Sequence, residues 1–194
     1  MSLLLEKVLR HWLARQRSLI PGRFLLYEEA VNRRLTVHRC KELDAVAAGT
    51  TADDTAPRFV FEFKASQNLL CLQRGRGQLR VRRRVMNRQW RGVGCCQIVV
   101  NTGTRAMVSE PAELLTPDDK LNWDLLGRLQ DGERIPLVVL PAETMLEYAK
   151  QVGFQFDQGL LASVRAYNES SRQERIRRKL RRRRRRRGKR RRSR

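Results

Sequence analysis

The sequence predicts an α+β protein, with a small antiparallel sheet at about residues 58–101, flanking helices and a basic C-terminal helix and tail. Three observations lead to this class. Apolar residues recur at helical spacing near the N-terminus, they alternate with a period of two after residue 58, and helical signals return after residue 115. A chain of 194 residues can hold one domain plus an extension. We expect an N-terminal segment 1–24, a body 25–157 and a C-terminal region 158–194.

Residues 1–24 are predicted to form a basic amphipathic helix that ends at Pro21 and Gly22. Apolar side chains such as Leu9 and Trp12 share one face, and Lys and Arg lie largely on the others. An arginine-rich, acid-poor segment of this kind is typical of a mitochondrial targeting sequence. A helix that packs on the domain, or that lies along RNA, explains the pattern equally well.

The next elements follow from local patterns. Residues 25–46 suit a second helix that runs into a short strand at Leu35–Arg39, and the small polar residues 47–57 suit an exposed loop. Phe59, Phe61 and Phe63 then occupy every second position, as in a strand whose aromatic face lies against a core.

A β-hairpin is expected after this strand. Apolar segments at 69–73 and 78–86 flank Arg74-Gly75-Arg76-Gly77, whose glycines permit the positive φ angles of a tight turn. Residues 96–101 supply another β-branched strand, which brings the expected sheet to three or four antiparallel strands.

The second half is predicted to begin with a helix after Thr116, which would be its N-cap, followed by Pro117 in the first turn. Ile135–Leu140 is an expected strand, and the prolines at its ends favour an edge position. A helix follows at residues 142–152. The final helix, after residue 157, is expected to leave the body as it becomes basic.

The positive charge is concentrated at the C-terminus. Residues 172–194 hold 17 Lys and Arg and one acid, Glu174, which is a net +16 of the +22 carried by the whole chain. Guanidinium groups match phosphate oxygens and can stack on unpaired bases, so this tail is predicted to bind nucleic acid. A nuclear import signal is the alternative. The predicted contacts are Arg175, Arg177, Arg178, Lys179, Arg181, Arg182, Arg183, Arg184, Arg185, Arg186, Arg187, Lys189, Arg190, Arg191 and Arg192.

A second basic segment lies within the body, with eight arginines and no acid at residues 74–91. On the expected hairpin, Arg80, Arg82 and Arg84 share one face, and the glycines at the tip let backbone amides approach a phosphate. A solvent-facing strand that Glu62 partly neutralises is the alternative. The predicted nucleic-acid contacts are Arg74, Arg76, Arg80, Arg82, Arg84, Arg88 and Arg91.

The sequence offers little for catalysis or for a cofactor. It contains none of the phosphate-binding-loop, serine hydrolase, zinc protease or dinucleotide motifs. Its adjacent aspartates suit a loop at 53–54 and helix capping at 118–119 better than acid–base chemistry. We therefore expect no enzyme and no cofactor. No run of about 18 uncharged apolar residues occurs, so no membrane span is expected.

A metal site is not expected either, because the cysteines lack C-x-x-C spacing and only two histidines are available. Buried free thiols in a reducing compartment are the better interpretation. The four cysteines are Cys40, Cys71, Cys95 and Cys96.

A compact body with a basic N-terminal helix, a basic hairpin and a long arginine tail resembles the layout of ribosomal proteins, particularly those of mitochondrial ribosomes. The resemblance is one of composition and architecture, without a diagnostic motif. It implies a structural RNA-binding protein of the mitochondrial matrix, a component or assembly partner of a ribosome, whose partners are rRNA and neighbouring ribonucleoprotein subunits. The alternative is a viral or nuclear protein that binds or packages nucleic acid.

Overall fold

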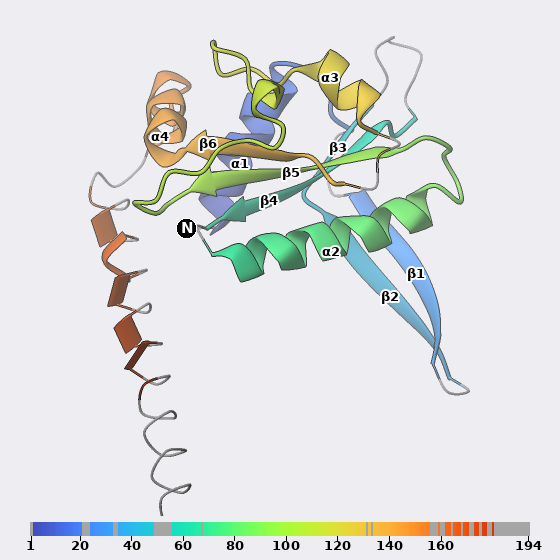
Figure 1. Ribbon diagram of the computed structural model, residues 1–194. Helices are drawn as coiled ribbons and strands as arrows, with labels where there is room; N and C mark the ends of the chain where they lie inside the picture. Colours follow the sequence, from blue (N-terminus) through green and yellow to red (C-terminus); the bar gives the residue numbers. More distant parts are fainter. Residues whose placement is uncertain are drawn as a thin grey trace, which may run out of the picture.

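A four-stranded sheet with the order β3-β4-β5-β6 forms the centre of the computed structural model (Figure 1). β3 is antiparallel to β4, whereas β4, β5 and β6 run parallel. β1 and β2 form a separate antiparallel hairpin, which projects beyond the body. The strands are β1 (Phe24–Asn32), β2 (Leu35–Leu43), β3 (Ala45–Ala47), β4 (Phe59–Ala65), β5 (Gly94–Asn101) and β6 (Leu137–Pro141).

Helices cover both faces of this sheet. Their bounds are α1 (Ser2–Ala14), α2 (Leu69–Met86), the 3₁₀ turn η1 (Ala112–Leu114), α3 (Trp123–Arg128) and α4 (Ala142–Gln151). The structure describes residues 2–20, 24–32, 35–48, 56–66, 68–130, 132, 134–155 and 159, together with 162–163, 165–167, 169–170, 173–174, 176–177 and 180. For residues 2–4, 24–32, 35–42 and 69 it describes the backbone alone.

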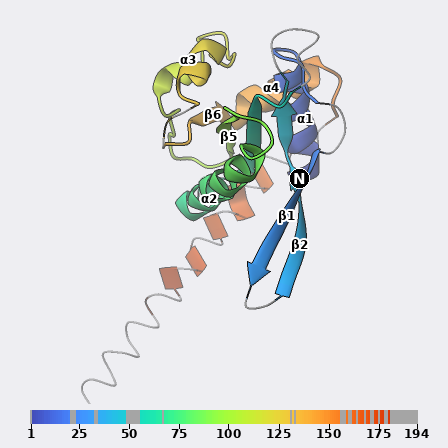
Figure 2. The ribbon, with the colours of Figure 1, turned by 90° about the vertical axis from the view of Figure 1, so that its right-hand side faces the viewer.

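Side chains alternate between the two faces of β4, which explains why the sheet lies as a middle layer between helices on both faces. Phe59, Phe61 and Phe63 are buried in a core cluster with residues of α1, α3 and α4. The intervening Val60 points to the opposite face, where it packs with Leu79 of α2. Figure 2 shows α1 and α2 on opposite sides of the strands. The expected aromatic strand, with its aromatic face toward a core, is therefore confirmed.

The α+β class is confirmed, but the antiparallel pairing predicted for residues 58–101 is wrong. The two strands of this range, β4 and β5, are parallel, with Phe59 opposite Gly94 and Ala65 opposite Val100. Parallel neighbours require a crossover connection, and α2 is that connection.

The predicted β-hairpin at residues 69–86 is wrong, because this segment is the single helix α2. Leu72, Leu79 and Met86 are buried and stand seven residues apart, a spacing that returns to one side of a helix after two turns. Asn68 is the N-cap, and its side chain accepts a hydrogen bond from the backbone N–H of Leu70 at 3.0 Å.

Gly75, which was expected in a turn, instead permits close packing of α2 on the sheet. Gly75 lies inside α2 on the side that faces the sheet, where a Cβ atom would stand 2.2 Å from Nε2 of Gln97. Glycine in a helix costs about 1 kcal/mol relative to alanine. That cost is offset here by a close approach between helix and sheet.

The N-terminal predictions are partly confirmed. The helix α1 ends at Ala14, earlier than expected, and its apolar face, including Leu9 and Trp12, is buried against the body. The helix expected within residues 25–46 is wrong, because this region forms β1 and β2; the expected strand at 35–39 lies inside β2. Most of the loop expected at 47–57 lies outside the described residues. A targeting function of residues 1–24 stays a prediction.

The second half largely follows the sequence patterns. β6 is an edge strand, and α4 occupies the segment expected for it. The preceding helix begins later than predicted, at Trp123 with Asn122 as its N-cap. Residues 116–120 form a turn instead, because Asp119 has a φ of 56°, and the backbone N–H of Thr116 donates to the Lys120 carbonyl at 2.8 Å.

Among the described residues, every helix is too short or too polar to span a bilayer.

Candidate functional site

A layer of polar side chains lies between α2 and the sheet. Glu62 of β4 is 2% exposed, and its partner in the parallel register, Gln97 of β5, is fully buried. Apolar clusters around Val60 and around Val99 flank this layer on either side. Polar groups in such a place need partners, since an unsatisfied buried group costs about 1–3 kcal/mol.

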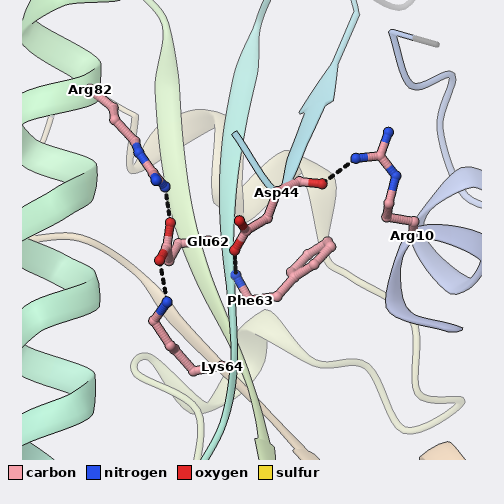
Figure 3. A network of polar contacts seen from close by, with 6 residues as sticks. All are labelled: Arg10, Asp44, Glu62, Phe63, Lys64 and Arg82. Atoms are coloured by element: carbon pink, nitrogen blue, oxygen red, sulfur yellow. Dashed lines mark hydrogen bonds and ion pairs between the residues drawn. The ribbon is translucent and has the colours of Figure 1, made fainter. Parts of the chain in front are cut away.

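Two cations share the Glu62 carboxylate. Arg82 of α2 donates to Oε2, and Lys64, two residues along β4, donates to Oε1 (Figure 3). The Lys64 side chain is 29% exposed and that of Arg82 only 9%, so the site opens to solvent on the Lys64 side. Burial lowers the pKa of the Arg82 guanidinium, and the nearby Asp44 carboxylate opposes that effect.

Asp44 brings a second carboxylate to this layer. It lies at the bend between β2 and β3, and its Oδ2 accepts a hydrogen bond from the backbone N–H of Phe63 at 2.6 Å. Arg10 of α1 holds the Asp44 carbonyl. The register of β3 with β4 begins at Ala45, which is paired with Phe61, and Asp44 is the bend residue just before it.

Gln97 is the unexplained member of the layer. Neither its amide nitrogen nor its amide oxygen has a hydrogen-bond partner in the structure. The point that a Cβ on Gly75 would occupy lies 2.2 Å from Gln97 Nε2 and 3.5 Å from Lys64 Cε, so both side chains reach the underside of α2 at Gly75. The buried amide therefore lies beneath the helix, on the strand next to Glu62.

Carboxylates are ligands that a hard divalent cation prefers, but both oxygens of Glu62 are already bonded, one by Arg82 and the other by Lys64. Mg²⁺ is commonly held by one or two carboxylates, with water and substrate phosphates completing its octahedron. No group of three or more His, Cys, Asp or Glu is arranged to hold a metal in the part of the chain that the structure describes. Asp44 and Glu62 would therefore hold Mg²⁺ only together with water or a phosphate.

The structure separates the arginines predicted as one surface. Arg80 and Arg84 are exposed on the outer side of α2, whereas Arg82 is buried, so the prediction that these three share a face is wrong. Arg76 is half-buried and pairs with Glu110 at 2.5 Å. The exposed members of the predicted set are Arg74, Arg80, Arg84, Arg88 and Arg91.

Most of the predicted tail contacts fall on residues that the structure does not describe. Arg177 is exposed. The remaining tail contacts lie outside the described residues: Arg175, Arg178, Lys179, Arg181, Arg182, Arg183, Arg184, Arg185, Arg186, Arg187, Lys189, Arg190, Arg191 and Arg192.

The predicted free thiols are confirmed where the structure describes them. Cys95 and Cys96 are buried and Cys71 is half-buried, and all three are free. Burial raises the pKa of the Cys95 and Cys96 thiols, although nearby Arg83 opposes the effect at Cys95. These thiols are therefore protonated at neutral pH. The side chain of Cys40 lies outside the described set.

Asp44, Lys64 and Gln97 were not expected as site residues from the sequence, and Glu62 was expected only as a neutralising charge. The available signal was the pair Glu62 and Lys64 on alternate positions of a strand whose other residues are apolar. A strand inside a parallel sheet is covered on both faces, so charged side chains there require an explanation.

Comparisons with protein-family models, curated proteins and solved structures find no match to the chain.

We expect Arg82→Met to lower the free energy of unfolding by about 3 kcal/mol, because a buried carboxylate would lose its most buried partner. Urea denaturation measures the change. Arg84→Met on the exposed side of the same helix is the matched control and should change stability by less than about 0.5 kcal/mol. Equal effects of the two substitutions would contradict a supporting role for the Arg82–Glu62 pair.

Proposed function

We propose that the protein binds nucleic acid and hydrolyses its phosphodiester bonds with Mg²⁺ held between Asp44 and Glu62. The observations that carry this proposal lie around the buried Glu62 carboxylate, which Lys64 bonds. Asp44, at the bend before β3, brings a second carboxylate near Arg82, the amide of Gln97 has no hydrogen-bond partner, and the outer side of α2 carries exposed arginines. Sequence motifs gave no reason to expect catalysis. The proposal rests on side chains that come together only in the fold.

Each residue has a distinct part in this chemistry. Bound Mg²⁺ would polarise the phosphate and favour ionisation of a water molecule near neutral pH. Asp44 and Glu62 supply the negative charge that holds the cation. The Lys64 ammonium, on the open side of the site, donates a hydrogen bond to a non-bridging phosphate oxygen and stabilises the charge that develops there.

The hydrolysis itself is a balanced displacement at phosphorus. A water oxygen forms the new bond to phosphorus while its proton passes to solvent. The bond to the leaving sugar oxygen breaks, and that oxygen takes a proton from solvent. Arg82 keeps its hydrogen bond to Oε2 of Glu62 throughout and so fixes the orientation of the carboxylate.

The exposed arginines and the tail explain how a polyanion would reach the site. Arg80 and Arg84 lie on the side of α2 turned away from the sheet, and Arg88 follows them beyond the helix end. Guanidinium groups bind phosphates without choosing among bases. We therefore expect the protein to bind nucleic acid of any sequence. Whether a substrate is cleaved should depend on whether its phosphates can reach Lys64, so the length and strandedness of the substrate matter.

We expect the full-length protein to cleave fluorescent RNA or DNA in the presence of Mg²⁺ and to lose this activity in EDTA. Asp44→Asn, Glu62→Gln and Lys64→Met should each lower the turnover rate by at least about 100-fold, because each removes a cation ligand or a donor to the transition state. Single-stranded and duplex RNA and DNA are separate arms of the assay.

The matched control is Glu147→Gln, which removes an exposed carboxylate from α4. It should cleave at the wild-type rate. Lys64→Met changes a half-exposed side chain and is the variant least able to disturb the fold. Cleavage that is equal in all variants would reveal a contaminant, and the absence of Mg²⁺-dependent cleavage on every substrate would overturn the proposal.

The second candidate is a structural RNA-binding protein, a component or assembly partner of a mitochondrial ribosome. The specific observation that favours it is the complete pairing of Glu62 by Arg82 and Lys64, as expected of an interior ion pair that serves only the fold. A viral or nuclear packaging protein is the corresponding alternative outside mitochondria. Both predict binding to nucleic acid with no cleavage.

Binding should depend steeply on salt in either case. If about eight phosphates are neutralised, log affinity falls with log salt at a slope of roughly −6 to −7. Deletion of residues 172–194 should bring the slope of log affinity against log salt closer to zero. The triple substitution Arg80→Gln, Arg84→Gln and Arg88→Gln should lower the magnitude of the slope by about 2 to 3 more. Fluorescence anisotropy measures both, with exposed Lys150→Gln as control. An unchanged slope after the deletion would exclude the tail from the interface.

A further inference from the structure

We propose that the sugar–phosphate backbone of a nucleic-acid strand crosses the outer side of α2 at Gly77, between Arg74 and Arg80. This inference rests on the nucleic-acid binding of the proposed function and does not involve the buried carboxylates. It goes beyond that function by assigning the contact to one place on the helix, where the strand meets protein backbone and guanidinium groups together.

The positive charge on the outer side of α2 is unopposed. The helix contains six arginines and no acidic residue, and two of the arginines are paired with acids from other parts of the chain. Among the described residues, no acid forms an ion pair with Arg74, Arg80 or Arg84, and all three are exposed. Like charges one helical turn apart, such as Arg80 and Arg84, repel one another and destabilise a helix. Phosphates on this side would remove that cost, because guanidinium groups match their oxygens.

Gly77 is a second feature of the same side. It lies inside α2, where glycine is less favourable than every other residue except proline. A Cβ atom at this position would meet nothing within 4 Å, so packing within the protein does not require the glycine. Gly75, by contrast, faces the sheet, and two residues turn an α-helix by about 200°. Gly77 therefore lies on the side of α2 turned away from the sheet, where it is exposed.

The charge and the glycine coincide in space. Arg74 and Arg80 stand three residues before and after Gly77, and residues three apart are neighbours on a helix surface. Glycine permits a ligand to approach the protein backbone closely. Without a side chain at Gly77, a strand can lie against the helix while the arginines on both sides donate to its phosphates. Such a contact positions the strand and selects no base sequence.

The direct test compares affinity with stability in Gly77→Gln. This substitution fills the open space with an uncharged side chain that favours a helix, so Tm should rise by about 2–4 °C. Affinity for nucleic acid should nevertheless fall at least about 10-fold, because the strand is displaced from the guanidinium groups on either side. Fluorescence anisotropy of the full-length protein in EDTA measures the affinity, with single-stranded and duplex RNA and DNA as separate arms.

The matched control is Gly127→Gln in α3, where a Cβ atom also meets nothing within 4 Å. It adds the same side chain to a helix that packs on the other face of the sheet, so it should bind as tightly as the wild type. Wild-type affinity of Gly77→Gln in every arm would overturn the proposal, as would equal losses in the two variants. Weaker binding of Gly77→Gln together with a lower Tm would place the effect in the fold and would also contradict it.

A double-mutant cycle tests whether the strand lies beside Arg80. Arg80→Gln alone should weaken binding and lower the magnitude of the salt slope by about 1. In the Gly77→Gln background the same substitution should have a clearly smaller effect, because the strand has already left that arginine. Additive effects of the two substitutions would count against a shared contact.

The two proposals fail in different ways. If the wild-type protein binds nucleic acid, loses affinity in Gly77→Gln and cleaves no substrate with Mg²⁺, the proposed hydrolysis fails and the contact at Gly77 stands. If the wild-type protein cleaves its substrate and Gly77→Gln binds as tightly as the wild type, the hydrolysis stands and the contact at Gly77 fails.

Discussion

The buried carboxylate of Glu62 is the constraint on which the α2 side of the molecule depends. An ionised group that is 2% exposed requires compensation, and Arg82 and Lys64 supply it from a helix and from the same strand. The position of α2 follows, because Arg82 must reach the carboxylate from above. Gly75 then lets the same helix approach Gln97 closely. The Glu62–Arg82 pair thus links α2 to β4, and buried Leu72, Leu79 and Met86 pack the same helix on the sheet.

Stability alone does not explain why this charge is inside. Replacement of a buried ion pair by apolar residues of similar volume is often neutral or stabilising by about 1–4 kcal/mol. The clusters around Val60 and Val99 show that apolar packing between α2 and the sheet is available on both sides of the polar layer. Under the proposed function, the carboxylates and the unpartnered amide of that layer serve a ligand, and the exposed arginines of α2 suit a phosphate polymer as that ligand.

The sequence predicted elements whose signals are local. The aromatic strand β4, the strands β5 and β6 and the helix α4 could be recognised from periodicity and from prolines alone. α2 could not, because the Arg-Gly-Arg-Gly segment gives a strong turn signal, while its apolar residues Leu72, Leu79 and Met86 are widely spaced among arginines. The site was equally hidden. Asp44 and Gln97 lie far from Glu62 in the chain. Strand pairing places Gln97 beside Glu62, and a hydrogen bond to the Phe63 backbone holds Asp44 on the same strand.

The most direct test of a cation held between Asp44 and Glu62 is a crystal structure of the full-length protein soaked in Mn²⁺, with anomalous scattering used to locate the ion. We expect an anomalous peak within coordination distance of both carboxylates. A map with no peak beside these carboxylates at saturating Mn²⁺ would contradict the account.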